Sequence, residues 1–423
     1  MRKIFLSLAF SLAAISAFSQ EEPKTGWVFT PMPDISYNSD IGLNLGAFCD
    51  FFYYGDGTIY PNFLHHIAYT AAWATKGAWY FHGMFESRAL IPGIRLSASV
   101  TYRDATMNNF YGFNGVFSPF DEQMDLNADT RTAFYTNRRR FFRSAVTFQG
   151  RVYGRLNWVA GAVYRYVKVS DFNLKNYDSG NSLYLKYIDN DLIHADEAGG
   201  GHSLEIKAGF TCDTRDIELA PHRGYYAEAY LLGNADLGRW KYNYAQLVLH
   251  WRHFVPLGTE RVIWAYHLGF QQRIAGEIPF YNLNELSTLN YQYEEYSGLG
   301  SRYTVRGYRY NSLTAEGYAW GNFELRVTPF RFDLWRQHFD IVLNPFVDLA
   351  LINPSYRRKQ QEALAAEGLF NEAAVGGNPL MVSAGCGLKL HMNTNFILSL
   401  DLGKAIGSPF SDLMIGMGTT YVF

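Results

Sequence analysis

The sequence predicts an all-β fold, a 16-stranded antiparallel transmembrane β-barrel, and three observations lead to it. Apolar and polar residues alternate with a period of two in many segments, so each strand has one face for lipid and one for an aqueous interior. Long connections follow only odd-numbered segments. Aromatic residues make up 17% of the 423 residues, as lipid-facing strands and interfacial girdles require. After the start of the chain there is no apolar run of about 18 residues, so helical spans are not expected.

The start of the chain has the pattern of a secretory signal. Met1-Arg-Lys3 is basic, Ile4 to Phe18 is a short apolar stretch, and Ala17-Phe18-Ser19 offers small residues for cleavage. We therefore predict a signal peptide over residues 1–19 and a single outer-membrane barrel domain over 20–423; a short buried helix is the alternative for 1–19. A closed barrel cannot be divided without exposing backbone edges to lipid.

Sixteen segments alternate, and the even number is the one that a bacterial single-chain barrel requires. They are 27–37, 40–53, 63–75, 77–89, 94–102, 138–149, 155–167, 203–213, 223–233, 240–254, 261–274, 318–328, 340–351, 380–391, 394–402 and 412–423.

The pattern is clear from Ser203 to Asp213, where Leu204, Ile206 and Phe210 alternate with polar residues such as Glu205. In a soluble sandwich the charged residues of such a strand would face a dry core at high cost. The alternation therefore indicates lipid outside the sheet and water inside it.

Loop lengths predict which end of the barrel lies outside the cell. The connections 91–93, 150–154, 256–260 and 392–393 are short and follow even-numbered segments, whereas 103–137, 168–202, 275–317 and 352–379 are long. Short periplasmic turns and long outer loops are typical of outer-membrane barrels. The composition of residues 357–367 also predicts a short surface helix in the last long connection.

Composition argues against several other functions. The formal charge of -2 gives no basic field for nucleic acid, and three scattered cysteines argue against a disulfide framework or a metal site. We find no Gly-x-Ser-x-Gly, His-Glu-x-x-His or phosphate-binding glycine loop. His65 and His66 face opposite sides of a strand and cannot chelate one ion together. No catalytic residue, metal or cofactor is expected.

The long connection 275–317, here called loop 6, carries Val305-Arg306-Gly307-Tyr308. Two acidic residues follow on predicted strands, and period two places both Glu324 and Asp348 on the polar face. We predict that loop 6 enters the barrel interior and that Arg306 pairs with Glu324, Asp348 or both, because a guanidinium can bridge two carboxylates. The alternative is a solvated outer loop in which Arg306 has no such partner.

The turn after the eighth segment is rich in charge. Asp213, Arg215, Asp216 and Arg223 are predicted to form a small salt-bridge cluster that closes a periplasmic turn. The alternative is a solvated turn punctuated by Pro and Gly. Aromatic residues near strand ends, namely Trp27, Trp73, Trp79 and Tyr421, are predicted to lie at the membrane interfaces.

Several of these pieces together resemble the BamA/TamA-type superfamily of outer-membrane assembly and secretion barrels, also called the bacterial surface antigen family. Val305-Arg306-Gly307-Tyr308 is similar to that family's loop 6 signature, and the segments around Glu324 and Asp348 resemble the wall that receives it. Gly209–Asp216, followed by Pro221–Gly224, resembles the family's strand-turn-strand. The end of the chain, with Tyr421 and Phe423, is similar to the aromatic-ended strand that marks barrels for insertion.

The resemblance implies a barrel that assists insertion or translocation of protein, or of lipid, through a weak seam between the first and last strands. The expected partners are outer-membrane lipid, client outer-membrane or secreted proteins, and a separate periplasmic accessory protein. The family's POTRA domains have no place before the first strand, so we expect a variant without them, and the resemblance does not reach the first five strands. The alternative from another class is a passive pore or structural barrel without insertase activity.

Overall fold

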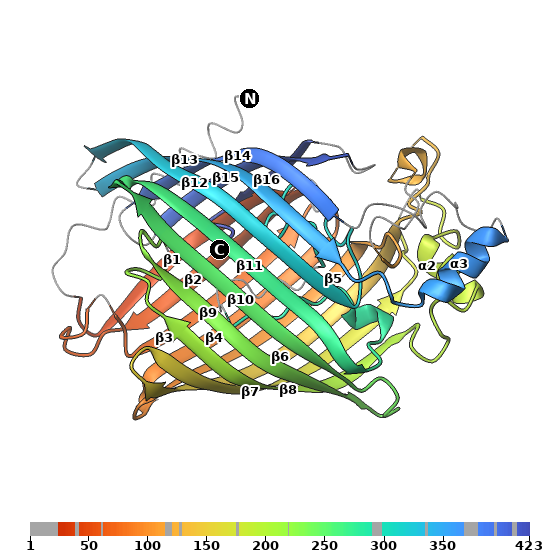
Figure 1. Cartoon of the computed structure of the whole chain (residues 1–423), viewed down its shortest axis with the longest axis horizontal. Coiled ribbons are helices and arrows are strands. Elements are labelled where there is room, and N and C mark those ends of the chain that lie inside the picture. Colours follow the sequence, from red (N-terminus) through yellow and green to blue (C-terminus); the bar gives the residue numbers. More distant parts are fainter. Residues whose placement is uncertain are drawn as a thin grey trace.

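The computed structural model contains sixteen antiparallel strands, which close into one barrel, so the predicted fold class is confirmed. Each strand pairs with its neighbours in the sequence, and β1 also pairs with β16 (Figure 1). The structure describes residues 24–38, 42–60, 62–114, 121–126, 129–174, 177–218, 220–289, 298–334, 337–367, 380–392, 396–407 and 413–423. The predicted signal peptide, residues 1–19, lies outside the described residues.

The strands are β1 (Trp27–Asn38), β2 (Gly42–Tyr53), β3 (His65–Ala74), β4 (Ala78–Ile91), β5 (Ile94–Asn109), β6 (Thr136–Tyr153), β7 (Leu156–Ser170), β8 (Gly200–Asp213), β9 (Gly224–Leu237), β10 (Tyr244–Leu257), β11 (Thr259–Gly276), β12 (Gly317–Leu334), β13 (Gln337–Ile352), β14 (Leu380–Met392), β15 (Phe396–Ile406) and β16 (Leu413–Gly418).

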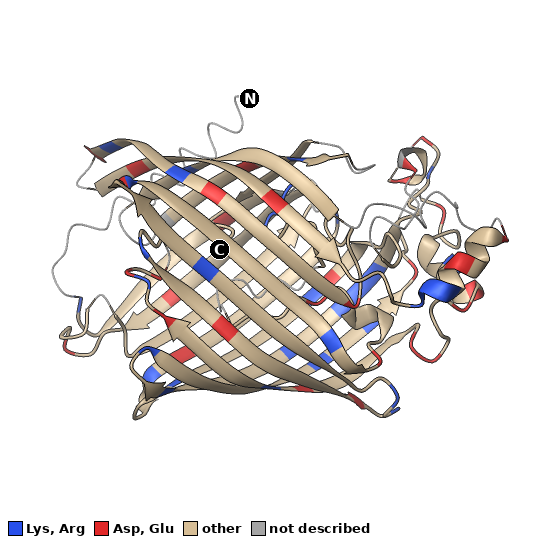
Figure 2. Ribbon diagram, in the orientation of Figure 1, with Lys and Arg blue, Asp and Glu red and all other residues tan. Residues whose placement is uncertain are grey.

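The two faces of the barrel wall differ as the alternation predicts. On β13, Leu343 and Val347 are 43% and 42% exposed, whereas Asn344 and Asp348, which each follow one of them, are fully buried. Figure 2 shows bands of charge crossing the middle of the strands as well as the loops. Because the outward side chains of a membrane barrel meet lipid, the buried polar side chains are those that point into the barrel.

The observed strands are longer than the alternation predicts at several ends. β5 continues to Asn109 and β6 begins at Thr136. The added residues do not alternate between apolar and polar, so the period of two did not predict them. The last strand is the exception. We predicted a strand over 412–423, but β16 ends at Gly418 because residues 421–423 are buried against inward-facing side chains of other strands.

The long connections lie at one end of the barrel, with α2 (Leu183–Asp189) and α3 (Arg358–Ala366) beside them (Figure 1). The predicted helix over 357–367 is therefore confirmed by α3. Two short 3-10 helices, η2 (Glu122–Met124) and η3 (Phe280–Asn282), also belong to these connections. No helix among the described residues is both long and apolar enough to cross a membrane.

An aromatic cluster packs the outer connections together. Phe113 stands edge-on to Tyr187 of α2, with ring centroids 5.1 Å apart, and to Tyr356, at 4.8 Å. Phe110 contacts Tyr187 and Phe280 in the same way. These rings come from four different connections, so apolar burial holds the outer loops and the start of loop 6 as one unit.

The closure between the first and last strands is much weaker than the rest of the wall. All twelve residues of β1 are registered with β2, from Trp27 with Tyr53 to Asn38 with Gly42. In the described part of the chain, β1 and β16 share one registered pair, Asn38 with Gly416. Most of the second edge of β1 therefore has no ladder to β16.

Candidate functional site: loop 6 inside the barrel

Loop 6, predicted over 275–317, connects β11 to β12 in the structure and comprises residues 277–316, of which 277–289 and 298–316 are described. Most of these residues are buried, including Val305 at 0% and Tyr308 at 2% exposure. They contact the inward side chains of the strands. We name residues 277–289 the first limb and residues 298–316 the second limb.

Arg306 meets two carboxylates on adjacent strands. Its Nε and Nη2 donate to Oδ2 and Oδ1 of Asp348 on β13 at 2.8 and 2.7 Å, and Nη1 donates to Oε1 of Glu324 on β12 at 2.5 Å. The backbone N–H of Arg306 also donates to Oδ2 of Asp348 at 2.9 Å. The three side chains are at most 2% exposed, so these are charge-assisted contacts away from bulk water.

Two further contacts at Arg306 were not anticipated. Asp401 of β15 places Oδ1 3.6 Å from Nη1, and the guanidinium lies 3.4 Å from the ring centroid of Phe346 on β13. Lys389 of β14 in turn lies 2.6 Å from Asp401. The sequence signal for Asp401 is a charged residue at an inward position of a late strand. Alternation alone does not predict which strands contact loop 6, so this signal does not identify Asp401 as a partner of Arg306.

Glycines let the backbone of loop 6 approach the wall closely. Gly307 has a φ of +87°, and a Cβ there would lie 2.7 Å from the backbone of Lys404. On the wall side, a Cβ at Gly403 would lie 2.9 Å from the amide nitrogen of Gly307. A side chain at either position would push the two backbones apart, so Gly307 is required both for its conformation and for its size.

The end of the chain also turns inward. The guanidinium carbon of Arg326 lies 3.7 Å from the centroid of the Tyr421 ring, and the hydroxyl of Tyr421 is 2.8 Å from Nε2 of His391. Nη2 of Arg326 donates to the carbonyl oxygen of Phe423 at 3.2 Å. The prediction that Tyr421 lies at a membrane interface is therefore wrong, because cation-π and polar contacts hold it inside the barrel. Trp27, Trp73 and Trp79 are exposed on the outer face.

Arg302 brings loop 6 to the seam. A Cβ at Gly416 of β16 would lie 2.9 Å from Cβ of Arg302, and one at Gly418 would overlap its guanidinium. Nη2 of Arg302 donates to the carbonyl oxygen of Thr420 at 3.3 Å. Its Nε and Nη1 are buried without a hydrogen-bond partner among the described residues.

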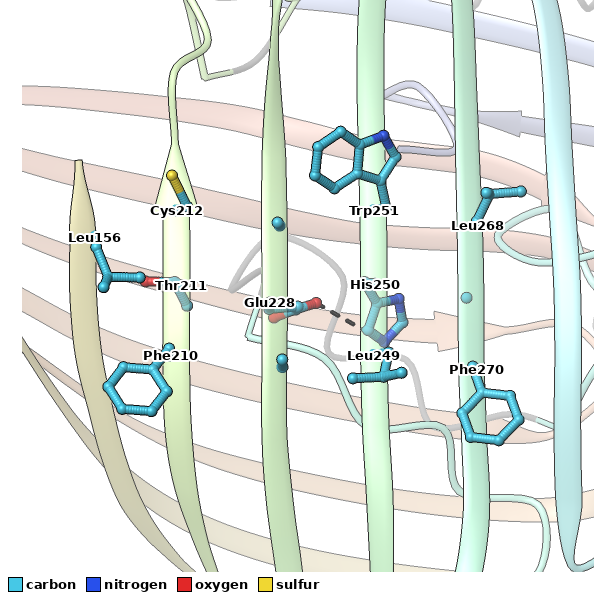
Figure 3. Close-up of a pocket in the computed structure, with 13 residues that line it drawn as sticks. Leu156, Phe210, Thr211, Cys212, Glu228, Leu249, His250, Trp251, Leu268 and Phe270 are labelled. Atoms are coloured by element: carbon cyan, nitrogen blue, oxygen red, sulfur yellow. Dashed lines mark ion pairs between the residues drawn. The ribbon is translucent and has the colours of Figure 1, made fainter.

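The first limb contacts a different part of the wall. Glu228 of β9 accepts from Thr288 Oγ1 and from the backbone N–H of Leu289, both at 2.7 Å, and lies 3.8 Å from His250 of β10 (Figure 3). On the outer surface of this part of the wall, Phe210 of β8 and Trp251 of β10 flank a shallow apolar groove of about 460 Å³. Polar contacts to loop 6 and an apolar outer surface thus lie on opposite faces of one sheet.

The charged turn after β8 differs from the predicted cluster. Arg215 pairs with Asp213 at 2.8 Å, and Asp216 accepts from the backbone N–H groups of residues 217, 222 and 223. Within the described turn, Arg223 contributes this backbone amide, and its side chain is exposed. Glu218 instead reaches Arg88 of β4 at 3.1 Å, so the turn is tied to another hairpin.

The described residues contain no group of three His, Cys, Asp or Glu side chains arranged to hold a metal ion. His65 and His66 bond to different residues, Ser87 at 2.9 Å and Asp50 at 2.7 Å. The groups that converge on loop 6 are suited to holding a polypeptide segment.

Comparison with known proteins follows the same lines. A model described as the Omp85 superfamily domain matches residues 68–417. BamA from Haemophilus ducreyi lacking POTRA domains 1–3 superposes with a TM-score of 0.60 at 15% identity, covering 98% of this chain and 78% of that one. CdiB from Escherichia coli gives 0.55 at 10% identity, covering 95% and 63%. At these identities the likeness concerns the fold. No curated protein sequence matches the chain.

Proposed function

Because the chain belongs to the Omp85 superfamily, a family of outer-membrane barrels for protein assembly and translocation, we propose that it assists the insertion or translocation of protein at the outer membrane. The observation that carries this proposal is the seam, where β1 and β16 share one registered pair among the described residues. An unpaired strand edge is a template for an incoming strand. The backbone of β1 would provide that edge, and outer-membrane lipid would surround it.

Loop 6 contributes rigidity in this proposal. Arg306 joins Glu324 of β12 and Asp348 of β13, and it lies near Asp401 of β15. It thereby acts as the anchor of the loop and stiffens the wall beside the seam. The seam can then open while this neighbouring wall keeps its register.

The working partners are a client protein and, for delivery of the client, a separate periplasmic accessory protein. Lipid is the second candidate substrate, since an opened seam also exposes the lumen to the membrane. Depletion in the native host followed by a census of outer-membrane proteins and surface lipids separates the two substrates. Broad loss of barrels supports assembly, and loss of one secreted product supports a dedicated translocator. Loss of surface lipid alone contradicts the protein substrate.

The seam is tested by a reversible cross-link. Tyr37 and Met417 lie next to the registered pair, and Tyr37 is 39% exposed on the outer face. In the Tyr37→Cys/Met417→Cys variant, oxidation should block client assembly into proteoliposomes and reduction should restore it. A pair at Phe29 and Phe51, which face each other in the β1–β2 ladder, is the matched control. Unchanged assembly with a locked seam contradicts the proposal.

A passive pore is the competing function, and the position of loop 6 argues against it. Its two limbs occupy the interior along the walls formed by β6–β10 and β12–β15. Single-channel recording provides the measurement. Steady, large conductance of the wild-type barrel would favour the pore.

A further inference from the structure

The first limb of loop 6 carries a buried acid, Glu285, that lies between two guanidinium groups of the wall. Oε1 of Glu285 lies 3.0 Å from Nη2 of Arg139 on β6, and Oε2 lies 2.7 Å from Nε of Arg165 on β7. The side chains of Glu285, Arg139 and Arg165 are 6%, 9% and 3% exposed. Arg165 also pairs with Glu205 of β8 at 3.1 Å. Two guanidinium groups thus face two carboxylates in a site with little water.

The polarity of this site is the reverse of that at Arg306. At Arg306 the loop supplies the cation and the wall supplies the carboxylates. At Glu285 the loop supplies the carboxylate and the wall supplies the cations. If either limb were placed at the other site, it would bring like charges together in a buried environment, at a large energetic cost. The two limbs are therefore not interchangeable.

The two sites lie on different parts of the barrel. In the sheet order, β8, β9, β10 and β11 separate β7 from β12. Backbone contacts hold the first limb to its own wall, since Nη2 of Arg139 also donates to the carbonyl oxygen of Tyr281 at 3.0 Å. The loop consequently extends across the interior from one wall to another.

We propose that Glu285 is a second positioning residue of loop 6, which fixes the first limb on Arg139 and Arg165 independently of Arg306. With both anchors in place, the first limb is fixed to β6 and β7 and the second limb to β12 and β13. This inference rests on the proposed role of loop 6, but its test reads only the position of the loop. The second anchor can therefore be disproved while the role in client assembly stands, and the role in client assembly can be disproved while the second anchor stands.

The test uses two reporter thiols with the same native exposure. Ser287 on the first limb and Thr304 on the second are both 8% exposed. Each is replaced by cysteine separately, in a chain whose Cys49, Cys212 and Cys386 are replaced by alanine. The folded barrel in detergent is then labelled with a water-soluble maleimide, and the labelling rate reports local opening.

Glu285→Arg places a third guanidinium in the site and should raise labelling in the Ser287→Cys reporter at least about tenfold, while labelling in the Thr304→Cys reporter changes less than about twofold. Arg306→Gln should raise labelling in the Thr304→Cys reporter and leave labelling in the Ser287→Cys reporter nearly unchanged. Glu277→Arg is the matched control, because Glu277 is in the same limb but its side chain is 47% exposed. This control should move neither reporter.

Two outcomes would overturn the proposal. One is unchanged labelling in the Ser287→Cys reporter, and the other is an equal rise in both reporters, which would make the limbs one unit. If Glu285→Arg does not yield a folded barrel, Glu285→Gln is measured with the same two reporters. It removes the charge with little change of shape, and a rise confined to the Ser287→Cys reporter is again required.

Discussion

The wall formed by β12 and β13 and the seam formed by β1 and β16 are opposites in the same barrel. The wall is registered from Tyr318 with Ile352 to Leu334 with Gln337, whereas the described residues of the seam share one registered pair. Loop 6 touches both, through Arg306 at the wall and Arg302 at the seam. The comparison teaches that one segment is bound tightly to the strong side of the barrel and loosely to the weak side.

The two arginines make the difference concrete. They stand four positions apart and are similarly buried, at 2% for Arg306 and 7% for Arg302. Arg306 has carboxylates around its guanidinium. Among the described residues, Arg302 donates one hydrogen bond, to the carbonyl oxygen of Thr420, and has two buried nitrogens without a hydrogen-bond partner. Burial alone therefore does not identify an anchor, because the set of partners decides how much a buried cation stabilises.

The largest expected effect is at the wall. Arg306→Ala leaves Asp348 buried without its cation and removes one of the two cations of Glu324, which keeps Nε of Arg326 at 2.9 Å, so the variant should lower the free energy of unfolding by about 3–5 kcal/mol. Arg306→Lys should fall between this variant and wild type, because an ammonium cannot bridge both carboxylates with the same geometry. Guanidinium titration in detergent micelles measures both.

The matched control for Arg306 is Arg358→Ala on α3. Its ion pair with Glu362 is exposed at 44% and 41%. This variant should cost only about 0.3–0.5 kcal/mol. Equal losses for Arg306→Ala and Arg358→Ala would remove the distinction between the wall and the surface.

A side chain at Gly416 is expected to act next most strongly, at the seam. A Cβ at Gly416 would lie 2.9 Å from Cβ of Arg302, so Gly416→Val should cost about 1–3 kcal/mol through overpacking. Gly233→Ala is the control, since a Cβ there meets nothing within 4 Å. The same titration applies, and a fully stable Gly416→Val barrel would show that loop 6 is not held close to β16.

Arg302→Ala should have a smaller effect than either. It removes one hydrogen bond to Thr420 but also removes buried nitrogens without partners, so the loss should be about 1 kcal/mol or less. Reporter cysteines at Tyr37 and Met417 would then cross-link at a different rate, because the seam has lost its contact with loop 6. A destabilisation as large as that of Arg306→Ala would contradict the comparison.

The smallest effect is expected at the turn between β8 and β9, where charges are paired but partly exposed. Partial burial opposes the charge of Glu218, yet Arg95, Arg88 and Arg215 together lower its pKa. A lowered pKa contributes stability that is present above the unfolded-state value, about 4.3, and is lost as pH falls through the folded-state value. Because Glu218 is 47% exposed, the contribution should be about 0.5 kcal/mol or less.

Glu218→Gln measures this contribution. The variant should be slightly less stable than wild type at neutral pH and equal to it at the acidic end. Unfolding midpoints across pH, compared between the two barrels, provide the data. A difference that grows as pH falls would have the wrong sign.

Much of the fold follows from local sequence patterns, because a barrel wall repeats every two residues. That period identifies all sixteen strands and puts Glu324 and Asp348 on the inner face, where the structure brings both to Arg306. The partner Asp401 could not be predicted in the same way, since its approach depends on how loop 6 crosses the interior. The inward turn at Tyr421 was missed because an aromatic near a strand end fits a membrane interface equally well. Within the described turn, the predicted salt bridge of Arg223 did not form, because a charge-rich turn can be closed by backbone amides instead of guanidinium groups.

The close contact between Arg302 and the glycines of β16 has a consequence for the order in which the barrel is built. Loop 6 precedes β12 to β16 in the chain, and Arg306 needs carboxylates from three of those strands. Arg306 can therefore make these contacts only once β12, β13 and β15 have joined the wall, and Arg302 then lies against the position that β16 takes.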